Sequence, residues 1–181
     1  MTDLIGHQLH VDWMGTRVLT LADLWPDKPR AMIVGLNPAP PSVEAGHYYQ
    51  GRIGQRQIRR LVQAGLFAAP ASGTFVEENA LAAGVGFTDI VKRPTPREGG
   101  VTAEELAYGR AVLARQLEER GVELVLCVFR HPVKALLGQD GSPGFQPQRT
   151  SWGARVFRLP GPMQDTAAAT AVMAELTAAL H

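Results

Sequence analysis

The sequence has little cysteine, little net charge and no long apolar run. Its single cysteine, Cys127, excludes a disulfide framework and a metal site built from cysteines. No apolar run approaches the roughly 18 residues that a membrane span requires, and the first residues lack the charged-then-apolar pattern of a secretion signal. A formal net charge of +1 gives no overall positive field, so any binding of nucleic acid must come from a local patch. We therefore expect a soluble, cytoplasmic domain, associated with the nucleoid if the source is bacterial.

The composition is typical of one folded domain. A chain of 181 residues suffices for one sizeable core and is short for two. Hydrophobic residues make up 45% and charged residues 19%, a balance that excludes a disordered chain. The 19 glycines and 13 prolines predict long structured loops between short elements.

Short apolar runs alternate with helical patterns along the chain. Ala31–Gly35 and 123–129 are typical of buried parallel strands, and Thr102 with Glu105 forms a capping box that begins a helix ending near residue 120. The other predicted elements are strands over 86–91 and 154–159 and helices over 52–65, 132–138 and around Val172, Leu176 and Leu180. This alternation predicts an α/β fold, a three-layer α/β/α sandwich with a mainly parallel central sheet. We expect a domain over 31–181, with residues 1–30 as an extended arm packed on it.

The loop after the first predicted strand carries candidate functional residues. Asn37 follows the strand directly, and the neighbouring prolines predict a rigid, non-helical loop over 36–41. Ligands of open α/β sheets bind at the carboxyl ends of the strands, where a rigidly held amide can position a water or a ligand. His47, Tyr48 and Tyr49 follow as an aromatic cluster that could stack on a flat base. The residues alone leave open the alternative that Asn37 caps a turn and the tyrosines fill the core.

Five blocks, in order, resemble the uracil-DNA glycosylase superfamily. GLNPAPPSVEAGHYYQG at 35–51 is similar to its first active-site motif, and GFTDIVKRP at 86–94 is similar to its second. The strand over 122–129, GFQP at 144–147 and FRLP at 157–160 follow with compatible spacing. Within the superfamily, the chain most resembles the branch of thymine-DNA glycosylase and mismatch-specific uracil-DNA glycosylase.

The resemblance implies a base-excision repair enzyme that flips a nucleotide out of DNA and hydrolyses its N-glycosidic bond. The base would be uracil or a related mismatched or damaged base. Asn37 would position the attacking water, Tyr49 would stack on the base, and backbone N–H groups would stabilise the departing anion. Asp89 would contact the base or help activate the water, unless it forms a strand-end Asx turn. The implied base pocket consists of Gly35, Leu36, Pro38, His47, Tyr48 and Tyr49. The implied enzyme is a monofunctional, monomeric hydrolase without metal or cofactor.

The last motif departs from the family pattern. Where the branch has a Pro- and Ser-rich segment that grips phosphates and fills the gap left by the flipped base, this chain has Gly161, Pro162, Met163 and Gln164. Met163 or Gln164 could act as the wedge, because apolar side chains can enter a base stack. The departure keeps alternatives open. The substrate could be hypoxanthine, single-stranded DNA or a modified base, or the chain could be a catalytically inactive nucleic-acid-binding module.

Basic residues follow three of the predicted strands or their loops and predict a one-sided DNA-binding patch. The predicted DNA contacts outside the 161–164 loop are Arg52, Lys92, Arg93, Arg130 and His131. A solvated helix face would explain the arginines between 52 and 60 equally well. His7, His10 and Asp12 could form a metal site on paper, but no fourth ligand is apparent, so we expect a polar surface arm there.

Overall fold

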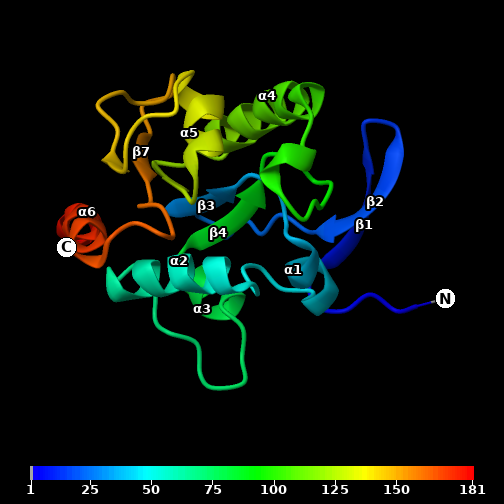
Figure 1. Cartoon of the computed structure of the whole chain (residues 1–181), viewed down its shortest axis with the longest axis horizontal. Coiled ribbons are helices and arrows are strands. Elements are labelled where there is room, and N and C mark those ends of the chain that lie inside the picture. Colours follow the sequence, from blue (N-terminus) through cyan, green and yellow to red (C-terminus); the bar gives the residue numbers. More distant parts are fainter. Residues whose placement is uncertain (1) are drawn as a thin grey trace.

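A computed structural model describes residues 2–181 and confirms the predicted α/β/α architecture (Figure 1). Its central sheet has the strand order β4-β3-β5-β7-β6. Four of these strands are parallel and the edge strand β6 is antiparallel. The strands are β3 (Ala31–Gly35), β4 (Val85–Asp89), β5 (Leu124–Cys127), β6 (Gly144–Phe145) and β7 (Arg155–Arg158).

Helices cover both faces of this sheet (Figure 1). They are α1 (Pro40–Ala45), α2 (Arg52–Gln63), α3 (Glu77–Ala82), α4 (Ala103–Glu119), α5 (Arg130–Leu137) and α6 (Thr166–Leu180). Because successive strand residues point to opposite faces, Ile33 packs in a core with α2, α3 and α6, whereas Met32 and Val34 pack in a core with α4 and α5. Among the helices of residues 2–181, none combines the length and apolar character needed to cross a membrane.

Several predicted helix ends are confirmed and one predicted loop is wrong. Thr102 and Glu105 form the expected capping box, and Gly138 ends α5 in the left-handed conformation at φ 82°. Residues 36–41 are not entirely a loop, because α1 begins at Pro40. Proline lacks a backbone N–H, but the first turn of a helix does not use that donor, so proline is tolerated there. The short helix α3 has no counterpart among the predicted elements.

The N-terminal segment folds as a β-hairpin, which the sequence did not predict. β1 (Gln8–Trp13) pairs antiparallel with β2 (Thr16–Leu21) through a two-residue turn at Met14 and Gly15, both with positive φ. Trp13 and Leu21 are buried in the two cores, so the hairpin packs on the sheet domain. The boundary between arm and domain at residue 30 stays a prediction, and Met1 of that arm lies outside the described residues.

Glu105 links the hairpin to α4. Its buried carboxylate accepts hydrogen bonds from Trp13 Nε1 at 2.9 Å and from Arg93 Nε and Nη2 at 3.0 and 2.7 Å. It also closes the capping box by accepting from the Thr102 N–H. The hydrogen bond from Arg93 is the main cause that lowers the pKa of Glu105 to about 2, while burial opposes the shift. The carboxylate therefore stabilises the fold most when it is ionised.

We expect Glu105→Gln to lower the free energy of unfolding at pH 7 by roughly 3 kcal/mol, because the native pKa lies below the unfolded value near 4.5. This stability is present above pH 4.5 and is lost as pH falls towards 2. Denaturant unfolding of both proteins at pH 7 and pH 2.5 measures it, and the difference should shrink at the lower pH. The exposed Glu104→Gln is the matched control and should change little. An equal loss at both pH values would contradict the assignment.

The order of the strands identifies the carboxyl ends of β3 and β4 as a candidate ligand position. The connection that leaves β3 runs through α1, α2 and α3 on one face, whereas the connection that leaves β4 runs through α4 on the other. Two neighbouring parallel strands whose connections leave to opposite faces are the usual ligand position in open α/β sheets. Asn37 and Asp89 both lie at these strand ends.

Candidate active site

Asp89 and Gly35 are partners at the end of the β3–β4 pair. A Cβ atom on Gly35 would overlap the Asp89 Oδ1 atom and would lie 3.2 Å from the Tyr49 hydroxyl oxygen. The missing side chain at Gly35 thus leaves the space in which these two polar groups approach the same strand end. This brings together three residues of the two sequence motifs.

We expect Gly35→Ala to disrupt this arrangement and to lower any activity of the site by roughly 100-fold, a loss typical of a misplaced reacting group. Gly99→Ala is the matched control, since a Cβ at Gly99 meets no atom within 4 Å. Thermal unfolding and turnover of both variants should be measured together. Full activity in a folded Gly35→Ala protein would show that the space beside Asp89 is not used.

Asn37 is held by its amide nitrogen. Nδ2 donates to the Arg93 carbonyl oxygen at 2.9 Å and to Thr95 Oγ1 at 2.8 Å. The buried Thr95 hydroxyl donates its own proton to the Arg97 carbonyl oxygen at 2.7 Å, so it can only accept from Asn37. Among residues 2–181, no group donates to the amide oxygen Oδ1, which is not sealed from solvent. Asn37 therefore presents a fixed acceptor at the strand ends, which is what positioning a water requires.

Asp89 is a buried carboxylic acid with a raised pKa. Only 6% of the residue is exposed, and no group in the described part of the chain donates to its carboxylate. Burial raises the pKa of Asp89 to about 7, with nearby Lys92 lowering it and Asp23 raising it further. Lys92 Nζ is held by Asp23 Oδ1 at 2.6 Å and by the Asp89 carbonyl oxygen at 2.7 Å. A carboxyl that titrates near neutral pH can both accept and release a proton during a reaction.

Tyr49 has a positive φ angle and a buried hydroxyl group without a hydrogen-bond partner among the described residues. Its φ of 58° is uncommon for a residue with a side chain, and its hydroxyl oxygen is buried without a hydrogen-bond partner in the chain described. Burial, and next the charge of Asp89, raise the pKa of Tyr49 well above its ordinary value. The first turn of α2 reaches Tyr49 closely because residue 54 is glycine, where a Cβ would lie 3.0 Å from the Tyr49 Cα.

The other predicted pocket residues have different surroundings in the structure. Tyr48 is buried in the core, where it stacks on Phe87 and donates its hydroxyl proton to the Ala22 carbonyl oxygen, so its side chain offers no face to a ligand. Leu36 packs in the core on the α4 side of the sheet, and Pro38 is buried beside Asn37 in sequence. His47 turns its Nδ1 atom to Glu77, at 3.2 Å.

Some of the predicted DNA contacts are already paired with carboxylates, whereas others are exposed and unpaired among the described residues. Arg93 is bound to Glu105 and Lys92 to Asp23, which leaves neither as a free cation. Arg130 and His131 pair with Glu98 near the surface. Arg52 is exposed and has no ion pair among the described residues, and Met163 is 83% exposed.

The 161–164 loop is fixed to α2 by contacts that the sequence did not reveal. Arg60 donates to the carbonyl oxygens of Pro160 and Gly161, both at 3.0 Å, and Arg56 donates to that of Pro162. Gln164 Oε1 accepts from the Gly161 N–H, which folds the loop on itself. Met163 is therefore an exposed side chain on a loop that hydrogen bonds hold to α2.

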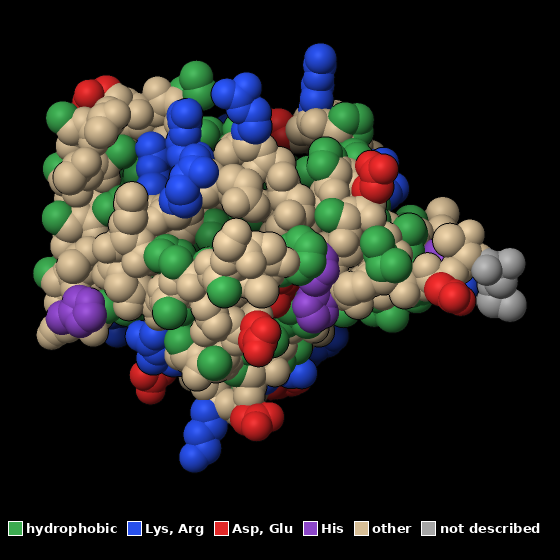
Figure 2. Space-filling model, turned by 90° about the horizontal axis from the view of Figure 1, so that it is seen from below, with side chains coloured by type: hydrophobic (Ala, Val, Ile, Leu, Met, Phe, Trp, Pro, Cys, Tyr) green, Lys and Arg blue, Asp and Glu red, His purple; other side chains and the backbone are tan. Residues whose placement is uncertain are grey.

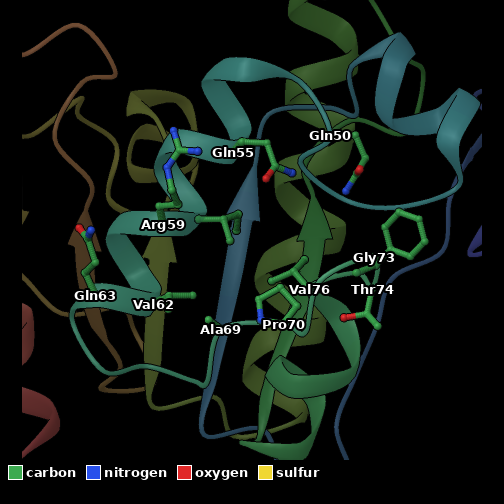
Figure 3. Close-up of a pocket in the computed structure, with 12 residues that line it drawn as sticks. Gln50, Gln55, Arg59, Val62, Gln63, Ala69, Pro70, Gly73, Thr74 and Val76 are labelled. Carbon is green, nitrogen blue, oxygen red and sulfur yellow. The ribbon is translucent and has the colours of Figure 1, made fainter.

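Two pockets border α2. One of about 580 Å³ lies between α2 and the 69–76 segment and is lined by Gln50, Gln55 and Arg59 (Figure 3). Another of about 790 Å³ lies between α2 and α6 and includes Arg56, Arg59 and Arg60. Seen from the side of α2 and α3, Lys and Arg side chains gather in one part of the surface (Figure 2). Neither pocket includes Asn37 or Asp89, so neither lies at the carboxyl ends of β3 and β4.

The family model of the uracil DNA glycosylase superfamily matches residues 22–173. None of the curated proteins matches the chain. The matched range includes β3 and β4, the loops after them and the 161–164 loop.

Proposed function

The chain belongs to the uracil DNA glycosylase superfamily, and from this premise we propose that it hydrolyses the N-glycosidic bond of uracil, or of a related mismatched or damaged base, in DNA. The superfamily supports DNA glycosylase activity and DNA as the partner. The observation that carries the finer proposal is the anchored amide of Asn37, whose oxygen accepts no hydrogen bond from the described residues and lies just past the end of β3. We assign the chain to the thymine-DNA and mismatch-specific uracil-DNA glycosylase branch on the GLNP start and the following His-Tyr-Tyr segment.

In the proposed reaction, Asn37 Oδ1 accepts a hydrogen bond from a water and holds it against the anomeric carbon of the flipped nucleotide. The C–N bond breaks, the base departs with the bonding electrons, and the water oxygen bonds to the sugar and releases a proton. An amide cannot take that proton, but ionised Asp89 can accept it from the water. In the alternative role, Asp89 accepts a hydrogen bond from a base N–H, and the proton of the water passes to solvent. Stabilisation of the leaving base by backbone N–H groups then carries much of the rate.

The DNA is proposed to lie across the strand ends. Tyr49 stacks on the flipped base, and exposed Met163 fills the gap that the base leaves. Arg52 contacts the phosphate backbone, since it is exposed and free of ion pairs within the described chain. Because Arg56 and Arg60 brace the 161–164 loop, their role in DNA binding is indirect.

Base release from labelled oligonucleotides tests this function. The panel contains uracil opposite guanine, uracil opposite adenine, thymine opposite guanine, hypoxanthine, and uracil in a single strand, each followed by alkaline cleavage of abasic sites. We expect cleavage of at least one substrate, and a preference for duplex over single strand if Met163 acts as the wedge. Salt-dependent binding without base release at excess enzyme would instead indicate an inactive nucleic-acid-binding module.

A further inference from the structure

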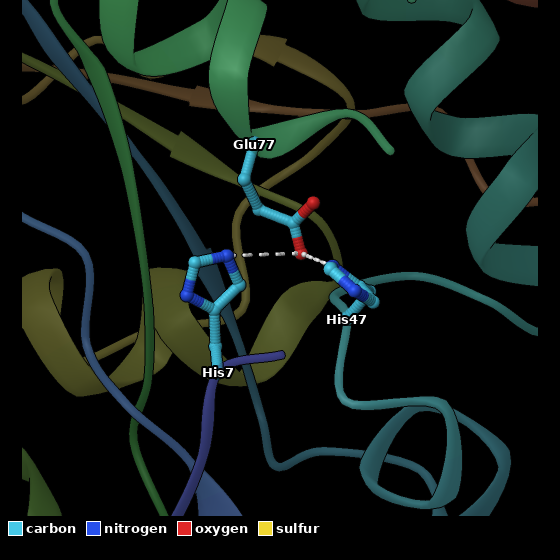
Figure 4. A group of neighbouring side chains, drawn as sticks. All are labelled: His7, His47 and Glu77. Carbon is cyan, nitrogen blue, oxygen red and sulfur yellow. Dashed lines mark hydrogen bonds and ion pairs between the residues drawn. The ribbon is translucent and has the colours of Figure 1, made fainter. Parts of the chain in front are cut away.

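A second group of chemically competent side chains is formed by His7, His47 and Glu77 (Figure 4). His47 Nδ1 lies 3.2 Å and His7 Nε2 lies 4.0 Å from the same oxygen, Glu77 Oε1. The three residues come from the segment before β1, the loop after α1 and the first turn of α3. One potential ligand atom of each lies within 4.8 Å of the others. The folded chain thus brings together three metal-binding side chains that are far apart in sequence.

Glu77 is a buried carboxyl group that has no Lys or Arg partner among the described residues. Its side chain is 3% exposed, and in the described chain its ion pairs are those with the two histidines. Its Oε2 atom is buried and has no hydrogen-bond partner in that part of the chain, while Oε1 also accepts the Tyr48 N–H at 2.9 Å. A buried carboxyl group with an unpartnered oxygen is costly unless it is paired or bound to a metal.

The His47 ring and the backbone of His7 are held in place before any ion binds. His47 stacks on Phe75 with ring centroids 3.4 Å apart and an interplanar angle of 4°. The backbone of His7 is held on both sides, since its N–H donates to the Gly46 carbonyl oxygen and its own carbonyl oxygen accepts from Ala22 N–H. Groups that are ordered in this way lose less freedom on binding a ligand than mobile ones would.

We propose that His7, His47 and Glu77 bind a divalent transition-metal ion of the zinc type. Two imidazole nitrogens and one carboxylate oxygen suit zinc, whereas magnesium and calcium prefer sites made of oxygen. Tetrahedral ligands at zinc distances stand about 3.4 Å from one another, and the separations of 3.2 and 4.0 Å need only small side-chain movements to match. Solvent supplies the fourth ligand past His7, whose side chain is 31% exposed.

The ion would join the N-terminal segment to the loop that carries Tyr48 and Tyr49. Glu77 already holds this loop through the Tyr48 N–H, and the bound ion would add a link through His47 and a link to the hairpin through His7. The site is therefore structural. The metal-binding proposal does not depend on whether the protein is a glycosylase. Its predicted effect is a more stable protein.

Zinc titration of the full chain, stripped with a chelator, tests the proposal. Calorimetry should give one equivalent bound, the melting temperature should rise with added zinc, and cobalt should give the absorption bands of a tetrahedral site. Magnesium should have none of these effects. His7→Gln and Glu77→Gln should each weaken zinc binding by at least about 10-fold.

His10→Gln is the matched control, because His10 is an exposed histidine on the adjacent strand β1 outside the cluster. It should bind zinc like the unaltered chain. If Glu77→Gln fails to fold, the partly exposed His7 still decides the question. The proposal is overturned if zinc does not bind at one equivalent, or if His7→Gln binds it unchanged. A melting temperature that responds to pH but not to zinc would also overturn it, leaving a histidine–carboxylate ion pair.

Discussion

Replacement of Asn37 by alanine is expected to lower the rate of base release by at least about 100-fold, while the protein still folds. The variant removes the acceptor that holds the water but leaves Asp89, Tyr49 and the rest of the proposed site in place. The fold loses two hydrogen bonds from the half-buried amide, to Arg93 and Thr95, which costs on the order of 1 kcal/mol each. Single-turnover base release and thermal unfolding of the variant measure the two effects separately. Unchanged single-turnover rates would refute the proposed role of the amide.

Thr95 supplies a matched pair of variants for the same mechanism. Its hydroxyl accepts from Asn37 Nδ2 and so sets which way the amide faces. Thr95→Val should reduce kcat by roughly 10-fold with little change in KM. The DNA contacts remain in this variant, and only the orientation of the Asn37 amide oxygen changes. Thr95→Ser keeps the hydroxyl and should restore the rate. If serine fails to rescue, Thr95 acts through packing rather than through orientation of Asn37.

Asp89→Asn is expected to lower the rate of base release and to remove the dependence of that rate on pH near neutrality. With a pKa of about 7, Asp89 is protonated in weak acid and ionised in weak base, so the rate should rise with pH through 7 and then level. The asparagine variant should show a flat profile, with a rate lower by roughly 100-fold at pH 8. A pH-dependent single-turnover rate indicates activation of the water, whereas a pH-dependent DNA affinity indicates a contact to the base. A profile that Asp89→Asn leaves unchanged would exclude both roles.

The same carboxyl should make the protein less stable as pH rises. Its native pKa lies above the unfolded value of 3.8, so the fold favours the protonated form. The cost of ionisation begins near pH 4 and is complete above pH 7, and it reaches on the order of 4 kcal/mol. Asp89→Asn should therefore be more stable than the unaltered chain at pH 8 and nearly equal to it at pH 4. Denaturant unfolding at both values measures the difference. A variant destabilised to the same extent at both would show that burial of Asp89 carries no such cost.

The fold class was predictable because its signals are local. The buried runs Ala31–Gly35 and Leu124–Cys127, the Thr102–Glu105 capping box and the glycine after α5 each depend on neighbouring residues. The hairpin was missed because its turn is Met14–Gly15 rather than the usual Asn-Gly pair, and α1 because its prolines were interpreted as excluding a helix.

The sequence alone predicted that Asn37 and Asp89 lie at or next to the ends of buried strands, and that strand ends of this kind meet at one edge of a sheet. Only the tertiary structure decided which neighbours each side chain has. It packed Tyr48 into the core, paired Lys92 and Arg93 with carboxylates, and brought His7, His47 and Glu77 together. The physical reason is that pairing of charges and burial of carboxyls depend on contacts between distant segments. Such contacts leave no periodicity or spacing in the chain.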